Sequence, residues 1–237
     1  SLYQCALPPY LTNTNGNKRG DALKLIHSAA AVSPNSFVRP LNDDTGKITF
    51  KLEKFAPANG IVHDNAHDAL GDVEATIGVC KIIKERCPDV WEAAMQTTSK
   101  QDVYKFINDD RIFCASRYFR GKEYTNGLAY LATDPTYQNH VYCFDLKTDP
   151  DLIFDLDRTE LKKLFKGKNK CFQLIKANEQ PILLDEKYLM QSEEFRDTDL
   201  NLLQERMQKV RKNKNFIEKF TNLLIDMNED KSFVEDQ

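Results

Sequence analysis

The spacing of apolar residues predicts helices near both ends of the chain. Residues 21–33 carry a helical stripe that Pro34 brings to an end, because proline interrupts helical hydrogen bonding. Residues 198–227 carry two more stripes, with a break near Asn213. Their members are Leu200, Leu203, Met207 and Val210, and then Phe216, Phe220, Leu223, Leu224 and Met227. We expect these two helices either to pack on the rest of the chain or to leave an apolar patch exposed.

The segment His63–Lys84 holds the most informative pattern. Four of its apolar residues recur at spacings of three and four: Leu70, Val73, Ile77 and Cys80. This spacing predicts a helix that buries the face they share, with Asn65 or Asp68 as its N-cap. Asp72 lies at the border of that face, where a carboxylate is costly unless a cation holds it. We therefore expect any chemistry of this chain to centre on Asp72 and on His67, five residues earlier.

The middle of the chain is typical of β-structure. The expected strands are residues 111–118, 128–133, 140–146, 171–176 and 181–184, separated by glycine, asparagine and proline turns. A short helix is expected from Asp157 or Thr159 to Phe165, and another over residues 89–97. Several short strands with little helix favour a small barrel. We place a domain boundary near Pro88, which gives two domains, residues 1–88 and 89–237.

Composition narrows the class of protein. The 237 residues carry a formal net charge of −3, which excludes a strongly basic, histone-like nucleic-acid binder but leaves room for a local basic groove. No apolar run approaches the roughly 20 residues of a membrane span. The six cysteines are scattered without close pairs, which favours reduced core thiols in a cytoplasmic protein.

Two interpretations of His67 and Asp72 stay open from the residues alone. In one, His67 is a surface or capping residue and Asp72 a solvated helix carboxylate. In the other, Asp72 binds magnesium, and the imidazole of His67 accepts a proton from an attacking water. A two-metal phosphodiesterase needs several converging carboxylates, so these two residues would supply only part of such a site.

The surrounding residues favour the second interpretation. The segments Leu52–Phe55, Ala58–Ile61 and Asn65–Thr76, together with His63, closely resemble bacterial exonuclease I. That family belongs to the DEDDh exonucleases, which have a ribonuclease H-like fold. The resemblance implies that His67 is the general base and that Asp72 is the last metal-binding acid of a site for two Mg²⁺ ions.

The resemblance also implies a fold class and a biological role. The fold is α+β: an incomplete ribonuclease H-like exonuclease portion followed by an SH3-like β-barrel domain with C-terminal helices. The activity is 3′→5′ hydrolysis of single-stranded DNA to nucleoside monophosphates, in DNA repair and recombination. The implied partners are single-stranded DNA and single-stranded DNA-binding protein, with no membrane, and we expect a monomer.

One departure from the family pattern changes the expectation for this chain. The first two acidic motifs of the family should lie upstream of His63, and residues 1–60 contain neither. We expect a central fragment that lacks these motifs and the C-terminal helical domain of the family, and that is inactive by itself. The alternative is a non-catalytic module that binds single-stranded DNA or a protein partner.

The segment Ser116–Tyr124 is a candidate DNA-binding loop. Its cations can meet phosphates and its aromatic rings can stack on bases. The residues we select are Tyr118, Phe119, Arg120 and Lys122. In the alternative interpretation the segment is a strand end whose aromatic side chains fill the barrel core and whose charges face water.

Overall fold

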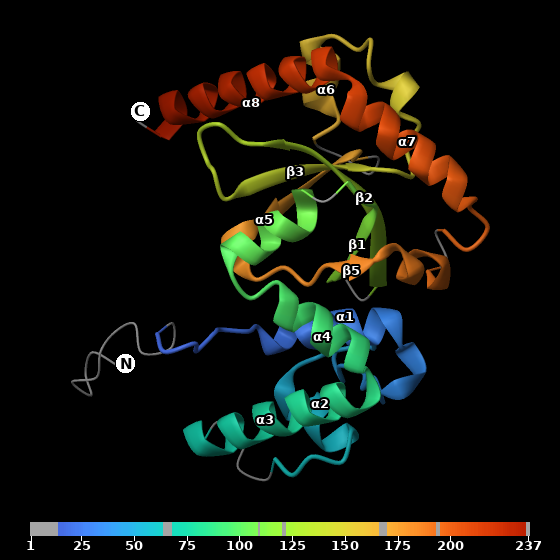
Figure 1. The fold of residues 1–237 in the computed structure, drawn as a ribbon. Helices are drawn as coiled ribbons and strands as arrows, with labels where there is room; N and C mark the ends of the chain where they lie inside the picture. The colour runs from blue at the N-terminus through green and yellow to red at the C-terminus, as the bar shows by residue number, and fades with distance from the viewer. Residues whose placement is uncertain are drawn as a thin grey trace.

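The computed structural model describes residues 14–63, 68–108, 110–119, 122–165, 170–192 and 195–235, with side chains at all of these except 117, 119, 122, 123 and 231–235. It has two parts, which lie one above the other in Figure 1. Residues 14–96, the helical region, form the lower part, and residues 100–235, the sheet region, form the upper part.

Four α-helices build the helical region: α1 (Ala22–Val32), α2 (Leu52–Ala58), α3 (Ala69–Arg86) and α4 (Pro88–Gln96). Asp21 caps α1 by accepting hydrogen bonds from the backbone N–H groups of Leu23 and Lys24. Asp68 caps α3 by accepting from the N–H of Gly71. Both predicted helices are therefore confirmed, and Asp68 is the N-cap of the second. The other candidate, Asn65, lies outside the described residues.

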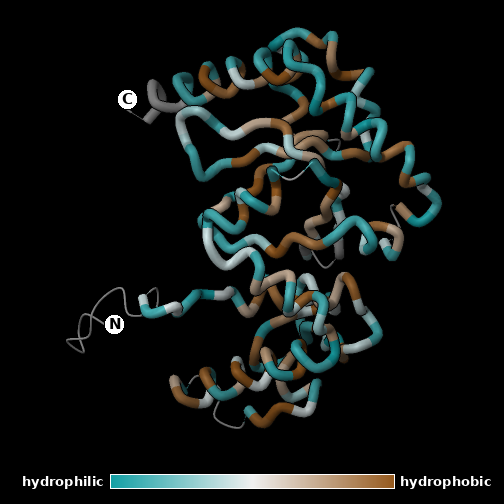
Figure 2. The backbone as a smooth tube through the Cα atoms, viewed as in Figure 1, coloured by the Kyte–Doolittle hydropathy of each residue, from teal (hydrophilic) through white to brown (hydrophobic). Residues whose placement is uncertain are grey.

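The predicted buried face of α3 is wrong. Leu70, Val73 and Ile77 are 65%, 54% and 49% exposed, and Cys80 is only partly buried. The face that packs against α1, α2 and α4 instead consists of Ala75, Val79 and Ile83. Apolar residues thus occupy two sides of this helix at helical spacing, and periodicity alone cannot choose between them. Figure 2 shows brown and teal stretches alternating along α3.

The sheet region begins with α5 (Lys100–Asn108), a helix that the sequence analysis missed. Five antiparallel strands follow in the spatial order β4-β3-β2-β1-β5. They are β1 (Phe113–Phe119), β2 (Lys122–Thr133), β3 (His140–Asp145), β4 (Phe172–Lys176) and β5 (Leu184–Asp185). The register pairs Phe113 with Leu128 across β1 and β2, and His140 with Lys176 across β3 and β4.

The sheet is open in the described residues, so the expectation of a closed barrel is corrected. Strands β4 and β5 form its two edges and do not pair with each other. The predicted strand 181–184 shrinks to the two residues of β5, which pair only with the start of β1. Pro181 has no N–H to donate to a ladder, which helps to explain the short strand.

Helices also pack on the sheet. These are α6 (Arg158–Lys163), α7 (Leu200–Lys212) and α8 (Lys214–Glu235). Of these, α7 and α8 contact the central strand of the sheet, β2. Phe220 of α8 lies in an aromatic cluster, with ring centroids 4.7 Å from Phe172, 5.5 Å from Phe165 and 5.8 Å from Tyr142. The C-terminal stripes therefore pack on the sheet, and Asn213 closes α7 at the predicted break.

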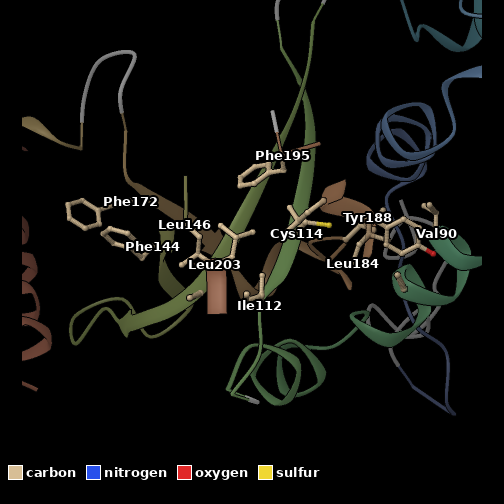
Figure 3. Packing of buried hydrophobic residues seen from close by; sticks show 14 of the residues in the cluster. Val90, Ile112, Cys114, Phe144, Leu146, Phe172, Leu184, Tyr188, Phe195 and Leu203 are labelled. Carbon is tan, nitrogen blue, oxygen red and sulfur yellow. The ribbon is translucent and has the colours of Figure 1, made fainter. Parts of the chain in front are cut away.

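One large core cluster contains residues of both regions. Figure 3 shows it running from Phe172 and Phe144 through Leu203 and Ile112 towards Tyr188 and Val90 of α4. A smaller cluster lies beneath α5, around Val103 and Ile107. The two regions thus share apolar contacts.

The described cysteines are free thiols, and four of the five are buried. Burial raises the pKa of the Cys114 thiol to about 12, which keeps it protonated at neutral pH. This agrees with the expectation of core thiols. None of the helices that the structure describes has the length and apolar content needed to cross a membrane.

Candidate active site and nucleic-acid interface

Asp72 lies in the first turn of α3, where the helix dipole favours a negative charge. Its backbone is held on both sides: its N–H donates to the Asp68 carbonyl at 2.9 Å, and its carbonyl accepts from the Thr76 hydroxyl at 2.7 Å. The side chain is 45% exposed. The sequence therefore places a fixed, accessible carboxylate at the N-terminal end of a helix.

The structure brings His63 to Asp72. Nε2 of His63 lies 2.8 Å from Oδ1 of Asp72, and the imidazole is only 2% exposed. Nδ1 is buried and has no hydrogen-bond partner in the described part of the chain. We did not select His63 as a site residue. The available signal was its position just after the Asn59-Gly60 turn, in the segment that leads to Asp72.

Close packing of the segment before His63 sets its position. Gly60 turns the chain with a φ of +81°, and the N–H of Ile61 then donates to the Ala56 carbonyl at 2.9 Å. Ile61 lies directly over Gly78 of α3, where an added Cβ would come within 2.7 Å of its Cγ2. Because glycine has no side chain, the segment can lie close to α3 at Gly78, and His63 then lies beside Asp72.

The predicted base, His67, lies outside the described residues. Within the residues that are described, no group of three or more His, Cys, Asp or Glu side chains could hold a metal ion. Magnesium takes six ligands, mostly oxygens and water. Asp72 can offer one carboxylate, so the described side chains do not by themselves form a magnesium site.

The described residues of the predicted DNA-binding loop are the end of β1 and the start of β2. Their register runs from Ser116 opposite Thr125 to Phe119 opposite Lys122. Arg120 lies outside the described residues, as do the side chains of Phe119 and Lys122. The segment is therefore two paired strand ends rather than an irregular loop, as the alternative interpretation expected.

Tyr118 packs against the helical region. Its ring meets that of Phe50 edge-on, with centroids 4.7 Å apart, and lies 5.6 Å from that of His27 on α1. Its hydroxyl lies 3.4 Å from the Ile48 carbonyl. Tyr118 is thus half-buried between the two regions and still borders a cavity.

That cavity has a volume of about 300 Å³ and lies between α1, β1 and β4. Lys24, His27, Tyr118 and Lys176 are among its lining residues. Lys176 pairs with Glu179 at 2.8 Å, and Lys24 donates to the carbonyl of the same glutamate. Burial lowers the pKa of His27 despite the nearby Asp21, so the imidazole is neutral at pH 7. Cations beside an aromatic ring are common in sites that bind single-stranded nucleic acid. Lys24 and Lys176 are far apart in the sequence, so the sequence alone did not show that they line one cavity.

A family model described as the exonuclease I SH3-like domain matches residues 98–225, more than half of the chain. The chain belongs to the exonuclease I family. This confirms the resemblance found in the sequence. The matched residues cover most of the sheet region, whereas the boundary near Pro88 and the ribonuclease H-like character of residues 1–88 stay predictions.

Individual relatives agree with the family model. Exodeoxyribonuclease I of Haemophilus influenzae is 31% identical over 207 residues, which are 80% of this chain and 43% of that protein. The Escherichia coli enzyme is 29% identical over 195 residues, or 77% of this chain and 41% of the enzyme. This chain thus spans less than half the length of these relatives.

Solved structures show the same likeness. E. coli exonuclease I in complex with a dT13 oligonucleotide superposes with a TM-score of 0.72 at 27% identity, over 94% of this chain and 51% of that one. A structure of an exonuclease I/SSB-Ct complex gives a TM-score of 0.71 at 26% identity, again over 94% of this chain and 51% of that one.

Proposed function

We propose that this chain is part of a 3′→5′ exonuclease that hydrolyses single-stranded DNA to nucleoside monophosphates in DNA repair and recombination. The observation that carries the proposal is the match to the exonuclease I family together with a half-exposed Asp72 at the start of α3. Relatives named exodeoxyribonuclease I, and related structures that hold oligonucleotides, support the reaction and its substrate class.

In this proposal each residue has a defined task. His67 accepts the proton of the water that attacks the terminal phosphodiester. Asp72 offers one carboxylate to a site for two Mg²⁺ ions, which when bound stabilise the charge that develops on the phosphate. The other carboxylates are not found among the described residues, and residues 1–60 lack the first two acidic motifs of the family, so we expect the 237-residue chain to be inactive alone.

The DNA contacts of the proposal lie at the junction of the two regions. Tyr118 and Phe119 end β1, Lys122 begins β2, and Tyr118 borders the cavity lined by Lys24 and Lys176. Arg120 is proposed to act with them. Single-stranded DNA would meet cations and aromatic rings there. Single-stranded DNA-binding protein is a second proposed partner, supported by the related SSB-Ct complex, and we propose a monomer.

Nucleotide release tests the reaction. End-labelled single-stranded DNA is incubated with Mg²⁺ and either the 237-residue chain or the polypeptide that the complete gene encodes. We expect release of mononucleotides from the 3′ end only by a polypeptide that supplies the other carboxylates, and loss of that release on Asp72→Ala. An active polypeptide that tolerates Asp72→Ala would contradict the site. DNA binding without any hydrolysis by the complete gene product would favour the non-catalytic module.

A charge-matched pair of variants tests the DNA contacts. Replacing Arg120 and Lys122 with alanine should weaken binding of single-stranded DNA and lower its salt dependence, because two phosphate contacts are lost. The control replaces Lys212 and Lys214, at the connection between α7 and α8, which changes the net charge equally. Equal affinities for the two double variants at low salt would contradict the assignment.

A further inference from the structure

We propose that His63 is a positioning residue that fixes the carboxylate of Asp72 through an Nε2–H to Oδ1 hydrogen bond. The proposal rests on the proposed function for its catalytic consequence, although the hydrogen bond itself is a property of this chain. His63 touches neither DNA nor the attacking water in this scheme, and it acts through Asp72.

The direction of the hydrogen bond follows from the chemistry of the two groups. An ionised carboxylate can only accept, so at 2.8 Å from Oδ1 the Nε2 atom must carry the hydrogen. Nδ1 is buried without a partner in the described residues, so Nε2 is the ring nitrogen that bonds within this part of the chain. The hydrogen bond to Asp72 therefore requires a hydrogen on Nε2.

His63 is well placed to hold Asp72 rigidly. The ring is almost fully buried, whereas the Asp72 side chain is nearly half exposed, so an accessible carboxylate is tied to a buried ring. The backbone of Asp72 is fixed by Asp68 and Thr76, and the hydrogen bond from His63 acts on the side chain. A hydrogen bond to one oxygen restricts the side-chain torsions and orients the carboxylate as a whole.

The packing that delivers His63 supports a dedicated role. The approach of Ile61 to Gly78 brings the segment into contact with α3 two residues before His63. Packing alone would not require a carboxylate beside His63, and a place in the first turn of α3 would not require an imidazole beside Asp72. The pair occurs at Asp72, the acidic residue that the proposed function takes from the described part of the chain.

Long-range ¹H–¹⁵N spectra of the histidine rings in the 237-residue chain test the hydrogen bond. We expect Nε2 of His63 to carry a hydrogen in the wild type, and the signal of this nitrogen to change in Asp72→Ala. The matched control is Asp68→Ala, which removes another carboxylate from the same helix end without touching His63. An Nδ1–H tautomer in the wild type, or equal spectra for the wild type and Asp72→Ala, would overturn the proposal.

Kinetics of the complete gene product test the consequence. His63→Leu removes the donor and should lower kcat by about 10- to 100-fold with little change in KM for the oligonucleotide, because the DNA contacts lie elsewhere. His63→Gln keeps an N–H donor at a similar reach and should recover most of that loss. Melting temperatures of both variants, recorded alongside, separate this role from a purely structural one.

The outcomes are distinguishable. Full kcat in His63→Leu, or equal losses in His63→Leu and His63→Gln, would overturn the positioning role while leaving the proposed function intact. An inactive wild type would overturn the proposed function, and the tautomer measurement would then still decide whether His63 holds Asp72. The spectra also decide the matter if His63→Leu fails to fold.

Discussion

The helical and sheet regions use similar amphipathic helices in different ways. In the sheet region, the stripes of α7 and α8 lie on a five-stranded sheet, and their large side chains are buried. In the helical region, the stripe of Leu70, Val73 and Ile77 on α3 has comparable spacing but is exposed. The described residues of this region contain an isolated bridge between Leu41 and Ile48 and no sheet on which that stripe could pack. A helical stripe therefore predicts a helix, while what it packs against depends on the rest of the fold.

The two regions also treat their carboxylates differently. Asp134 in the sheet region is buried and accepts hydrogen bonds from Asn228 at 2.9 and 3.0 Å and from two backbone N–H groups. It ties α8 to the β2–β3 hairpin and is satisfied by the protein. Asp72 in the helical region is held by His63 and remains accessible. This contrast is the one expected between a structural carboxylate and one that serves a site.

The largest effect should come from the aromatic core of the sheet region. Phe220→Ala should lower the free energy of unfolding by about 3–5 kcal/mol, because it leaves a cavity among four other rings. Urea unfolding measures this loss. The control, Leu202→Ala on the outer side of α7, should change the free energy by less than about 0.5 kcal/mol. Similar values for the two variants would contradict the packing described for the sheet region.

Two isoleucines on α3 test the helical region directly. Ile83→Ala should cost about 2–5 kcal/mol because this side chain is fully buried. Ile77→Ala makes the same chemical change six residues earlier on the exposed side and should cost less than about 1 kcal/mol. Urea unfolding of both variants decides the matter. A larger loss for Ile77→Ala would show that the outward stripe is covered.

The smallest effect concerns a hydrogen bond between the regions. The hydroxyl of Tyr188 donates to Asp89 of α4, and this bond lowers the pKa of the Asp89 carboxyl, with help from Lys187. Because the pKa of Asp89 is lower in the folded than in the unfolded chain, its ionisation stabilises the fold at pH values above the unfolded pKa of about 3.9. This stabilisation is lost as the pH falls through the pKa of Asp89 in the folded chain. Tyr188→Phe should therefore raise the pKa of Asp89 and make the free energy of unfolding fall less between neutral and acidic pH.

A carbon-13 titration of the aspartate carboxyls measures this shift. Asp102 is an internal control, since its lowered pKa depends first on Ser99 and not on Tyr188. An unchanged Asp89 titration in Tyr188→Phe would show that the hydrogen bond does not form in solution. A shift of Asp102 as well would indicate a general disturbance of the fold.

Local patterns predicted most of the elements. The capping aspartates, Pro34 and the turns after β2 are short-range signals, and they located α1, α3 and three of the strands to within a few residues. Helix α5 was missed although Val103 and Ile107 have helical spacing and Ser99 and Asp102 begin it with a hydrogen bond. That nine-residue pattern was too short to stand out beside the strands that follow.

Long-range geometry could not be predicted in the same way. Whether β4 and β5 meet depends on the curvature of the whole sheet, which no local pattern encodes. For the site, the family motif pointed to Asp72 and His67, and both stay predictions. His63 escaped notice because its role depends on the close approach of Ile61 to Gly78, a contact between segments that periodicity does not report.

The open sheet has a consequence for how this protein behaves at high concentration. Unlike a barrel, it leaves two strand edges whose backbone groups could pair with a second molecule. The β5 edge is only two residues long, which is too short to template a stable ladder. The β4 edge ends in Lys176, whose charge disfavours the approach of an identical strand. Both edges thus carry features that natural sheet proteins use against aggregation.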